Sequence, residues 1–195
     1  MTAFQIRPLR ADDSIDDLTT LVHRAFARLG RMGLGCTGVM QSPQVTSERV
    51  RRGACFVALH GPRLAGTMTL ETPGPRRECA WYRQRDVASL HQFAVDPCEQ
   101  GCGCGTRLLQ FAERWVAGQS YAELALDTPV AARHLVDFYE AHGFRRVGEL
   151  RKPGKDYCSV VLSKRVTHAG AATEVAHTGL WGAPHRMHWG VLLPH

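Results

Sequence analysis

Residues Phe93 to Phe111 read FAVDPCEQGCGCGTRLLQF and carry the most informative pattern in the chain. The apolar run Ala88–Val95 indicates a strand, and Asp96 with Pro97 ends it. A glycine-rich turn follows, and apolar spacing then predicts a helix over Thr106–Ala117. This order places the start of a helix beside the end of a strand.

The turn has glycine at three alternate positions, Gly101, Gly103 and Gly105. Without Cβ atoms, successive backbone N–H groups there can converge on one point. The helix start adds partial positive charge, and Arg107 lies in its first turn. The segment therefore predicts an anion site suited to a pyrophosphate. The competing interpretation is a flexible turn without a ligand, and the GxxxxGK[ST] and GxGxxG patterns are both absent.

Apolar periodicity predicts further elements on both sides of this segment. Upstream we expect a strand at Phe4–Pro8, a helix at Ser14–Leu29, an irregular loop at Gly30–Gly38, a helix at Ser47–Arg52, a hairpin of Ala54–Leu59 and Leu64–Leu70, and a surface excursion at Glu71–Arg85. Downstream we expect a strand at Leu124–Leu126, a helix at Val130–His142, and strands at Val147–Leu150 and Tyr157–Ser163.

Strands and helices thus interleave along the chain, which predicts an α/β or α+β fold with a mixed central sheet flanked by helices. Residues 1–164 form the predicted domain. Residues 165–195 lack periodicity and are interpreted as a C-terminal tail, either mobile or docked as an extension through its large apolar residues.

Composition excludes several classes of protein. The chain is 44% apolar and 22% charged, with a net charge of +6, as is ordinary for a globular protein. No basic run is interleaved with aromatics, so we expect no nucleic-acid partner. No apolar run reaches the roughly 18 residues of a membrane span. The N-terminus lacks a signal-peptide pattern, so we expect a cytoplasmic protein without a membrane partner.

The seven cysteines are an odd number, so they cannot all pair as disulfides. Cys98, Cys102 and Cys104 invite a metal interpretation. No Cys/His pair with finger-like spacing follows them, so we expect no metal.

The spacing Gln100-x-x-Gly103-x-Gly105 resembles the acetyl-CoA signature [RQ]-x-x-G-x-[GA] of the GNAT acetyltransferase superfamily. The helix end Phe138–Phe144, FYEAHGF, is similar to a second feature of that family, and the element order agrees over about residues 4–164. The resemblance implies a mostly antiparallel sheet whose fourth and fifth strands splay apart, with acetyl-CoA as co-substrate in the gap.

The same resemblance implies roles for individual residues. Main-chain groups of Phe93, Ala94 and Val95 would bond the thioester end and the pantetheine arm. The pyrophosphate would be held by backbone N–H groups of Gln100, Gly101, Cys102, Gly103, Cys104, Gly105 and Thr106. Tyr139 would give a proton to the departing thiolate, whereas its spacing alone favours a core aromatic.

A base must take the proton of the amine. We expect His91 to do so, because alternation puts it on the same strand face as Phe93. A histidine in the core or on the surface is the other interpretation, and Asp127 and Glu71 are weaker candidates. In many family members an asparagine seven residues before the tyrosine contacts the pantetheine arm, but here that position is Ala132.

Together with the resemblance, these residues predict an N-acetyltransferase that acts on a primary amine of a small molecule or peptide by direct attack. The acceptor would enter between the loops Gly30–Gln41 and Lys152–Tyr157, where Arg31, Arg151 and Lys152 are available to a carboxylate. A non-catalytic module that binds acyl-CoA remains the alternative. Transfer to oxygen, transfer of longer acyl groups and a homodimer also stay open.

Overall fold

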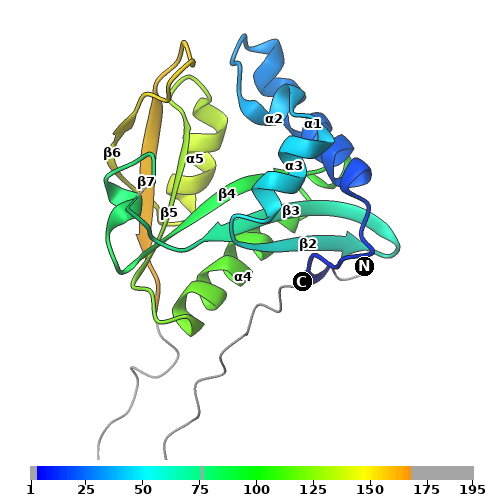
Figure 1. Ribbon diagram of the computed structural model, residues 1–195, viewed down its shortest axis with the longest axis horizontal. Coiled ribbons are helices and arrows are strands. Elements are labelled where there is room, and N and C mark those ends of the chain that lie inside the picture. The colour runs from blue at the N-terminus through cyan, green and yellow to red at the C-terminus, as the bar shows by residue number, and fades with distance from the viewer. Residues whose placement is uncertain (1–3, 76, 168–195) are drawn as a thin grey trace, which may run out of the picture.

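The computed structural model describes residues 4–75 and 77–167, so the predicted tail lies almost wholly outside the described residues. Figure 1 shows its elements, which follow in chain order. They are β1 (Gln5–Pro8), α1 (Ile15–Arg31), α2 (Thr37–Met40), α3 (Pro43–Val50), β2 (Ala54–His60), β3 (Arg63–Glu71), the 3-10 turn η1 (Trp81–Arg83), β4 (Val87–Val95), η2 (Pro97–Glu99), α4 (Cys104–Gly118), β5 (Glu123–Pro129), α5 (Arg133–Ala141), β6 (Arg145–Leu150) and β7 (Ser159–Arg165).

Seven strands of the described chain form one sheet in the order β1-β2-β3-β4-β5-β7-β6. Every neighbouring pair is antiparallel except β4 and β5, which are parallel. The predicted mixed, mostly antiparallel sheet is therefore confirmed. α1 packs on β3 and β4 from one side, and α4 packs on β3, β4 and β5 from the other.

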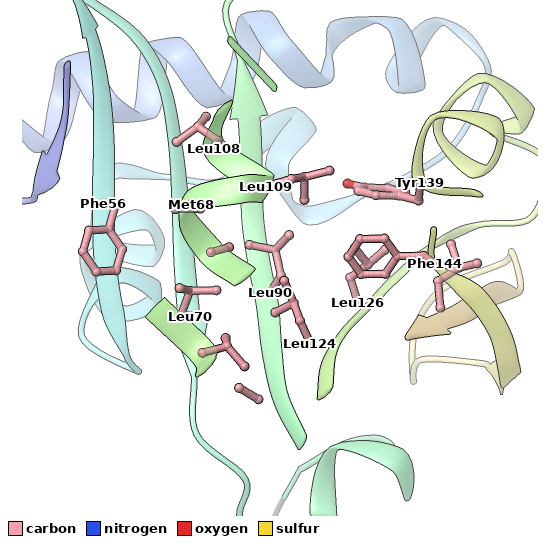
Figure 2. Close-up of a cluster of buried hydrophobic side chains, with 14 of the residues drawn as sticks. Phe56, Met68, Leu70, Leu90, Leu108, Leu109, Leu124, Leu126, Tyr139 and Phe144 are labelled. Atoms are coloured by element: carbon pink, nitrogen blue, oxygen red, sulfur yellow. The ribbon is translucent and has the colours of Figure 1, made fainter. Parts of the chain in front are cut away.

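The main core lies between the sheet and the helices α4 and α5. Leu108 and Leu109 of α4 are fully buried against leucines of β3, β4 and β5 (Figure 2). Burying each such leucine contributes roughly 1.5–3 kcal/mol. A smaller cluster on the other face joins Leu18 and Leu21 of α1 to Val57. Apolar residues therefore lie on both faces of the sheet, and helices pack against each face.

β4 and β5 separate after a short contact. They pair only from Val87 with Glu123 to Ser89 with Ala125, although β4 continues to Val95 and β5 to Pro129. Figure 1 shows the two halves of the molecule diverging from this contact. The predicted splay is confirmed, and it leaves one edge of β4 without a neighbouring strand.

A bulge interrupts β4 just where the two strands part. Ala94 faces Thr67 and His91 faces Thr69, so Gln92 and Phe93 together oppose Met68. Gln92 has a positive φ of 49°, an uncommon conformation for a residue other than glycine. Bulges re-aim side chains and occur often beside active sites.

Some predicted boundaries were wrong. α3 begins at Pro43 rather than Ser47, because Ser42 accepts a hydrogen bond from the Val45 N–H as its N-cap. The loop expected at Gly30–Gly38 contains the end of α1 and the start of α2. The expected surface excursion is anchored, because Cys79 and Tyr82 pack against β4, β5 and β7.

The end of the predicted domain can be compared with the structure only up to residue 167. Arg165 still belongs to β7, and Val166 donates a backbone hydrogen bond to Ala122 and packs on the core.

Candidate active site

A cleft of about 960 Å³ opens between the separated ends of β4 and β5. Its walls come from both halves of the molecule. One wall contains β4 and the glycine-rich turn, and the other contains the end of β5, α5 and the β6–β7 loop, while α1 and α2 border its mouth. Most of the residues predicted for the cofactor line it, namely Phe93, Ala94, Val95, Gln100, Gly101, Gly103, Gly105 and Thr106.

The glycine-rich turn leads directly into α4. Gly101 and Gly103 have φ values of 77° and 84°, which favour glycine, and Gly103 is the N-cap. α4 therefore starts at Cys104, two residues before the predicted start. Within the described part of the chain, no backbone N–H from Gly101 to Thr106 has an acceptor. These N–H groups and the helix dipole together favour an anion.

Buried carboxylates hold the turn in place. Asp96 is paired with Arg24 and accepts from the Cys98 N–H at 3.0 Å. Glu99, which is 6% exposed, lies 3.1 Å from His60 and 3.1 Å from Arg63 of the β2–β3 hairpin. The turn is thus pre-organised by side chains from two other elements.

The side chain of Gln100 closes the turn onto β4 by donating to the Val95 carbonyl at 3.2 Å. That carbonyl, which the family resemblance implied for the pantetheine arm, therefore already has a donor.

Two of the predicted cofactor residues do not line the cleft through their side chains. Cys104 is 1% exposed, and burial raises the pKa of its thiol to about 11. Cys102 is exposed on the turn. Only their backbone N–H groups are placed to take part. Over residues 4–75 and 77–167, no group of three or more His, Cys, Asp or Glu side chains could hold a metal ion.

His142, which the sequence did not single out, ties the start of α4 to the end of α5. Its Nδ1 lies 2.7 Å from the Phe138 carbonyl, which can only accept, so Nδ1 carries the proton. Its Nε2 then accepts from the Thr106 hydroxyl at 2.9 Å. This bond connects the first turn of α4 to α5, whose residues Phe138 and Tyr139 line the cleft.

Tyr139 lies on α5 at the edge of the main core. Its ring centroid lies 6.2 Å from that of Phe93 and 5.8 Å from that of Phe144, whose ring lies beside it in Figure 2. The residue is 6% exposed and lines the cleft. Burial, with a smaller contribution from the charge of Asp127, raises the pKa of Tyr139 above its ordinary value. Tyr139 is therefore a protonated donor at neutral pH.

The expected shared face of His91 and Phe93 was wrong, because the bulge at Gln92 breaks the alternation between them. Phe93 packs toward α5, whereas the His91 ring lies 5.6 Å from Tyr82 on the opposite face. His91 Nε2 is 2.9 Å from Ser89 Oγ. Burial lowers the pKa of His91 to about 3, so it is neutral at physiological pH and a weak base.

The two weaker base candidates have different positions. Asp127 lines the cleft and lies 3.1 Å from the Tyr82 hydroxyl and 3.0 Å from Lys152 Nζ. Glu71 is paired with Arg77 and does not line the cleft, and burial raises its pKa. Of the three candidate bases, His91 and Asp127 line the cleft and Glu71 does not.

The sequence missed a buried polar network beside the bulge. Gln41 donates from Nε2 to Thr46 at 2.7 Å and to Gln92 Oε1 at 3.1 Å, and accepts from Arg49 Nη1 at 2.9 Å. Arg49 and Gln92 line the cleft. The residues are far apart in the chain, and no motif connects them.

The two loops between which the acceptor was expected to enter contact each other. Lys155 Nζ donates to the Gly35 carbonyl, and Tyr157 packs against Leu34 and Cys36. Arg31 and Lys152 line the cleft, whereas Arg151 does not. Ala132 is fully buried in this contact beside Leu29, Leu34 and Cys36.

A model of the acetyltransferase (GNAT) family matches residues 21–144. The chain belongs to the GNAT acetyltransferase family. The resemblance inferred from Gln100–Gly105 and Phe138–Phe144 is thereby confirmed.

Across residues 4–75 and 77–167, no helix of this GNAT protein is both long and apolar enough to cross a membrane.

Two curated relatives come from Bacillus subtilis (strain 168). S-(2-succino)cysteine N-acetyltransferase is 27% identical over 165 residues, which cover 82% of this chain and 95% of the relative. S-alkylcysteine N-acetyltransferase is 24% identical over 151 residues, which cover 73% and 79%. The chain is thus similar to two enzymes named for cysteine derivatives.

Solved structures agree on the fold. A Bacillus subtilis acetyltransferase solved in complex with CoA superposes with a TM-score of 0.61 at 18% identity, covering 85% of this chain and 100% of that one. At this identity the likeness concerns the fold.

Proposed function

We propose that this protein transfers the acetyl group of acetyl-CoA to the α-amino group of a small amino acid derived from cysteine. The row of N–H groups from Gly101 to Thr106, none with an acceptor in the described chain, carries this proposal. It opens into the same cleft as Tyr139. The names of the two curated relatives support the acceptor class, and a structure of this fold has been solved with CoA.

In the proposed reaction, the diphosphate of acetyl-CoA lies at the start of α4 and the pantetheine arm runs along the free edge of β4. N–H groups of β4 near the bulge would stabilise the charge that develops on the thioester oxygen. The acceptor nitrogen attacks the carbonyl carbon, a C–N bond forms, and the C–S bond then breaks.

Two protons must move in this sequence. The attacking nitrogen loses one to neutral His91 or through it to water, and the CoA thiolate gains one from Tyr139. Water then reprotonates Tyr139. Its raised pKa is compatible with this role, because the low polarity that raises the pKa of the phenol also raises that of the leaving thiol.

The test is thiol release from acetyl-CoA with a panel of S-substituted cysteines and unrelated amines, with mass spectrometry of the product. We expect N-acetylated cysteine derivatives, and we expect Tyr139→Phe to lower kcat by about 100-fold or more with an unchanged KM for acetyl-CoA. Tyr121→Phe is the matched control, because Tyr121 follows the other end of α4 and does not line the cleft.

Binding of CoA in calorimetry without thiol release for any amine would contradict the proposal. That outcome would support the non-catalytic module instead.

A further inference from the structure

Arg49 is a cation in the cleft without an anionic partner. Its guanidinium donates to the neutral amide of Gln41 at 2.9 Å, and within the described chain no carboxylate lies in ion-pair range of it. Arg24 and Arg77, by contrast, are paired with Asp96 and Glu71. Burial lowers the pKa of Arg49, although arginine stays charged at neutral pH. A half-buried charge without a partner is costly for the folded protein.

Gln92 supplies a second unused donor beside it. The residue is 3% exposed, its Oε1 accepts from Gln41, and its Nε2 has no hydrogen-bond partner within the described residues. Buried polar groups are nearly always hydrogen-bonded, so an unpaired one beside a cleft needs an explanation. A ligand that accepts hydrogen bonds would provide one.

Gln41 holds both donors in a fixed arrangement. One amide accepts from Arg49 through Oε1 and donates to Gln92 through Nε2. Gln41 is itself anchored to Thr46, whose hydroxyl also accepts from Thr19 of α1. The two donors are therefore pre-organised. Among the other cations that line the cleft, Lys152 is already paired with Asp127, and Lys155 donates to the Gly35 carbonyl.

We propose that Arg49 and Gln92 form a subsite for the α-carboxylate of the acceptor amino acid. Gln92 directly precedes Phe93 at the bulge, where β4 and β5 part. A carboxylate bound there holds its amine close to the point of attack, which suits an α-amino acid better than an acid group at the end of a long substituent. Arginine binds carboxylates through two parallel hydrogen bonds. This inference names the recognition element of the proposed function and rests on it.

The turnover experiment compares three acceptors. S-methyl-L-cysteine has the α-carboxylate, S-methyl-L-cysteine amide has none, and S-(carboxymethyl)cysteamine has a carboxylate only at its far end. We expect Arg49→Gln to raise the KM for S-methyl-L-cysteine by about 10- to 100-fold and to leave the other two acceptors and acetyl-CoA unchanged. Arg49→Lys keeps the charge but not the two parallel donors of the guanidinium, so its KM for S-methyl-L-cysteine should lie between those of the unmutated protein and Arg49→Gln.

Arg51→Gln is the matched control, because it removes the same charge at the end of α3 from an exposed residue that does not line the cleft. Thermal melting checks that each variant folds. Equal KM values for the acid and the amide in the unmutated protein would overturn the subsite. An equal rise in KM for S-methyl-L-cysteine and its amide in Arg49→Gln would also overturn it. A lower KM for S-(carboxymethyl)cysteamine than for S-methyl-L-cysteine would do the same.

A binding experiment separates this inference from the proposed function. Calorimetry measures S-methyl-L-cysteine binding to the CoA-loaded protein, where no acetyl group is available. An affinity that falls about 10- to 100-fold in Arg49→Gln supports the subsite even if no amine is ever acetylated. Undetectable binding to the unmutated protein, or binding that Arg49→Gln leaves unchanged, overturns the subsite even if turnover is observed.

Discussion

The part of the cleft proposed for acetyl-CoA, the cofactor wall, and the part proposed for the acceptor, the acceptor wall, are built in different ways. The wall proposed for acetyl-CoA comes from one continuous segment, Phe93–Thr106, and offers backbone N–H groups. The wall proposed for the acceptor is assembled from side chains that lie far apart in the sequence. They are Arg49, Gln92, Asp127 and Lys152, which come from α3, β4, β5 and the β6–β7 loop. Gln41 of the α2–α3 connection does not line the cleft but bonds both Arg49 and Gln92.

The difference follows from what each ligand requires. A diphosphate is recognised by converging backbone dipoles, so the segment needs glycines and a helix start rather than particular side chains. An acceptor is recognised by the functional groups it carries, and these need specific donors at specific places. The cofactor wall should therefore be sensitive to backbone geometry and the acceptor wall to side-chain chemistry.

The largest effect is expected from Gly103→Val, which tests the backbone wall. A β-branched residue disfavours the φ of 84°, so the N–H groups of the turn would no longer converge. Losing about two charge-assisted hydrogen bonds should raise the Kd for acetyl-CoA by about 100-fold in calorimetry.

Gly61→Val is its control, because Gly61 has a φ of 60° and, like Gly103, no atom within 4 Å of an added Cβ. Both variants should lose about 1–2 kcal/mol of unfolding free energy. Unchanged CoA affinity in Gly103→Val would show that the turn does not bind the diphosphate.

His91→Gln tests the side-chain wall and should lower kcat by about tenfold, because a histidine with a pKa of about 3 is a weak base. Burial keeps His91 neutral from pH 5 to 8, so its titration should leave no inflection near pH 6.5 in kcat/KM. The rate should instead fall with decreasing pH as the acceptor amine itself becomes protonated. An inflection near 6.5 that disappears in His91→Gln would contradict this account.

Ala132→Asn tests the boundary between the two walls. The resemblance suggests that asparagine here would contact the pantetheine arm, but Ala132 is fully buried among apolar residues. We expect an unpaired amide to cost about 1–3 kcal/mol of unfolding free energy in denaturant titration, with less than a roughly threefold change in CoA affinity. Ala131→Asn at the exposed neighbouring position is the control. Tighter CoA binding without a loss of stability would argue that this site faces the cofactor.

Asp13→Asn should have the smallest effect on activity, because Asp13 does not line the cleft that contains Arg49 and the glycine-rich turn. Asp13 binds both Nη atoms of Arg7 at 2.6 and 2.7 Å, and chiefly this bond lowers its pKa to about 2. At pH 7 we expect a loss of about 1 kcal/mol or less in urea unfolding, because solvent screens this pair, with unchanged kcat/KM.

The pH dependence of this loss has a defined sign. The folded-state pKa of Asp13 lies below the unfolded value, so its contribution is present above pH 4 and disappears as the pH falls toward 2. The exposed Asp12→Asn should leave stability unchanged at both pH values. A loss that persists at pH 2 would contradict the ion-pair explanation.

Local patterns in the sequence correctly predicted the order of strands and longer helices. Ser14 caps α1 as expected, by accepting from the Asp17 N–H. The short helix α2 was missed, because a single turn has no detectable period. The bulge was missed as well, so alternation put His91 and Phe93 on one face. One extra residue in a strand leaves the residue pattern intact but reverses the side chains that follow.

The sequence by itself determined the fold class and the family and predicted an anion-binding turn, because these depend on periodicity and on residues adjacent in the chain. Only the tertiary structure brought Arg49, Gln41 and Gln92 together, half-buried His91 and buried Ala132. Contacts of that kind form when α1–α3 pack on a sheet whose strands have parted, and no spacing along the chain encodes them.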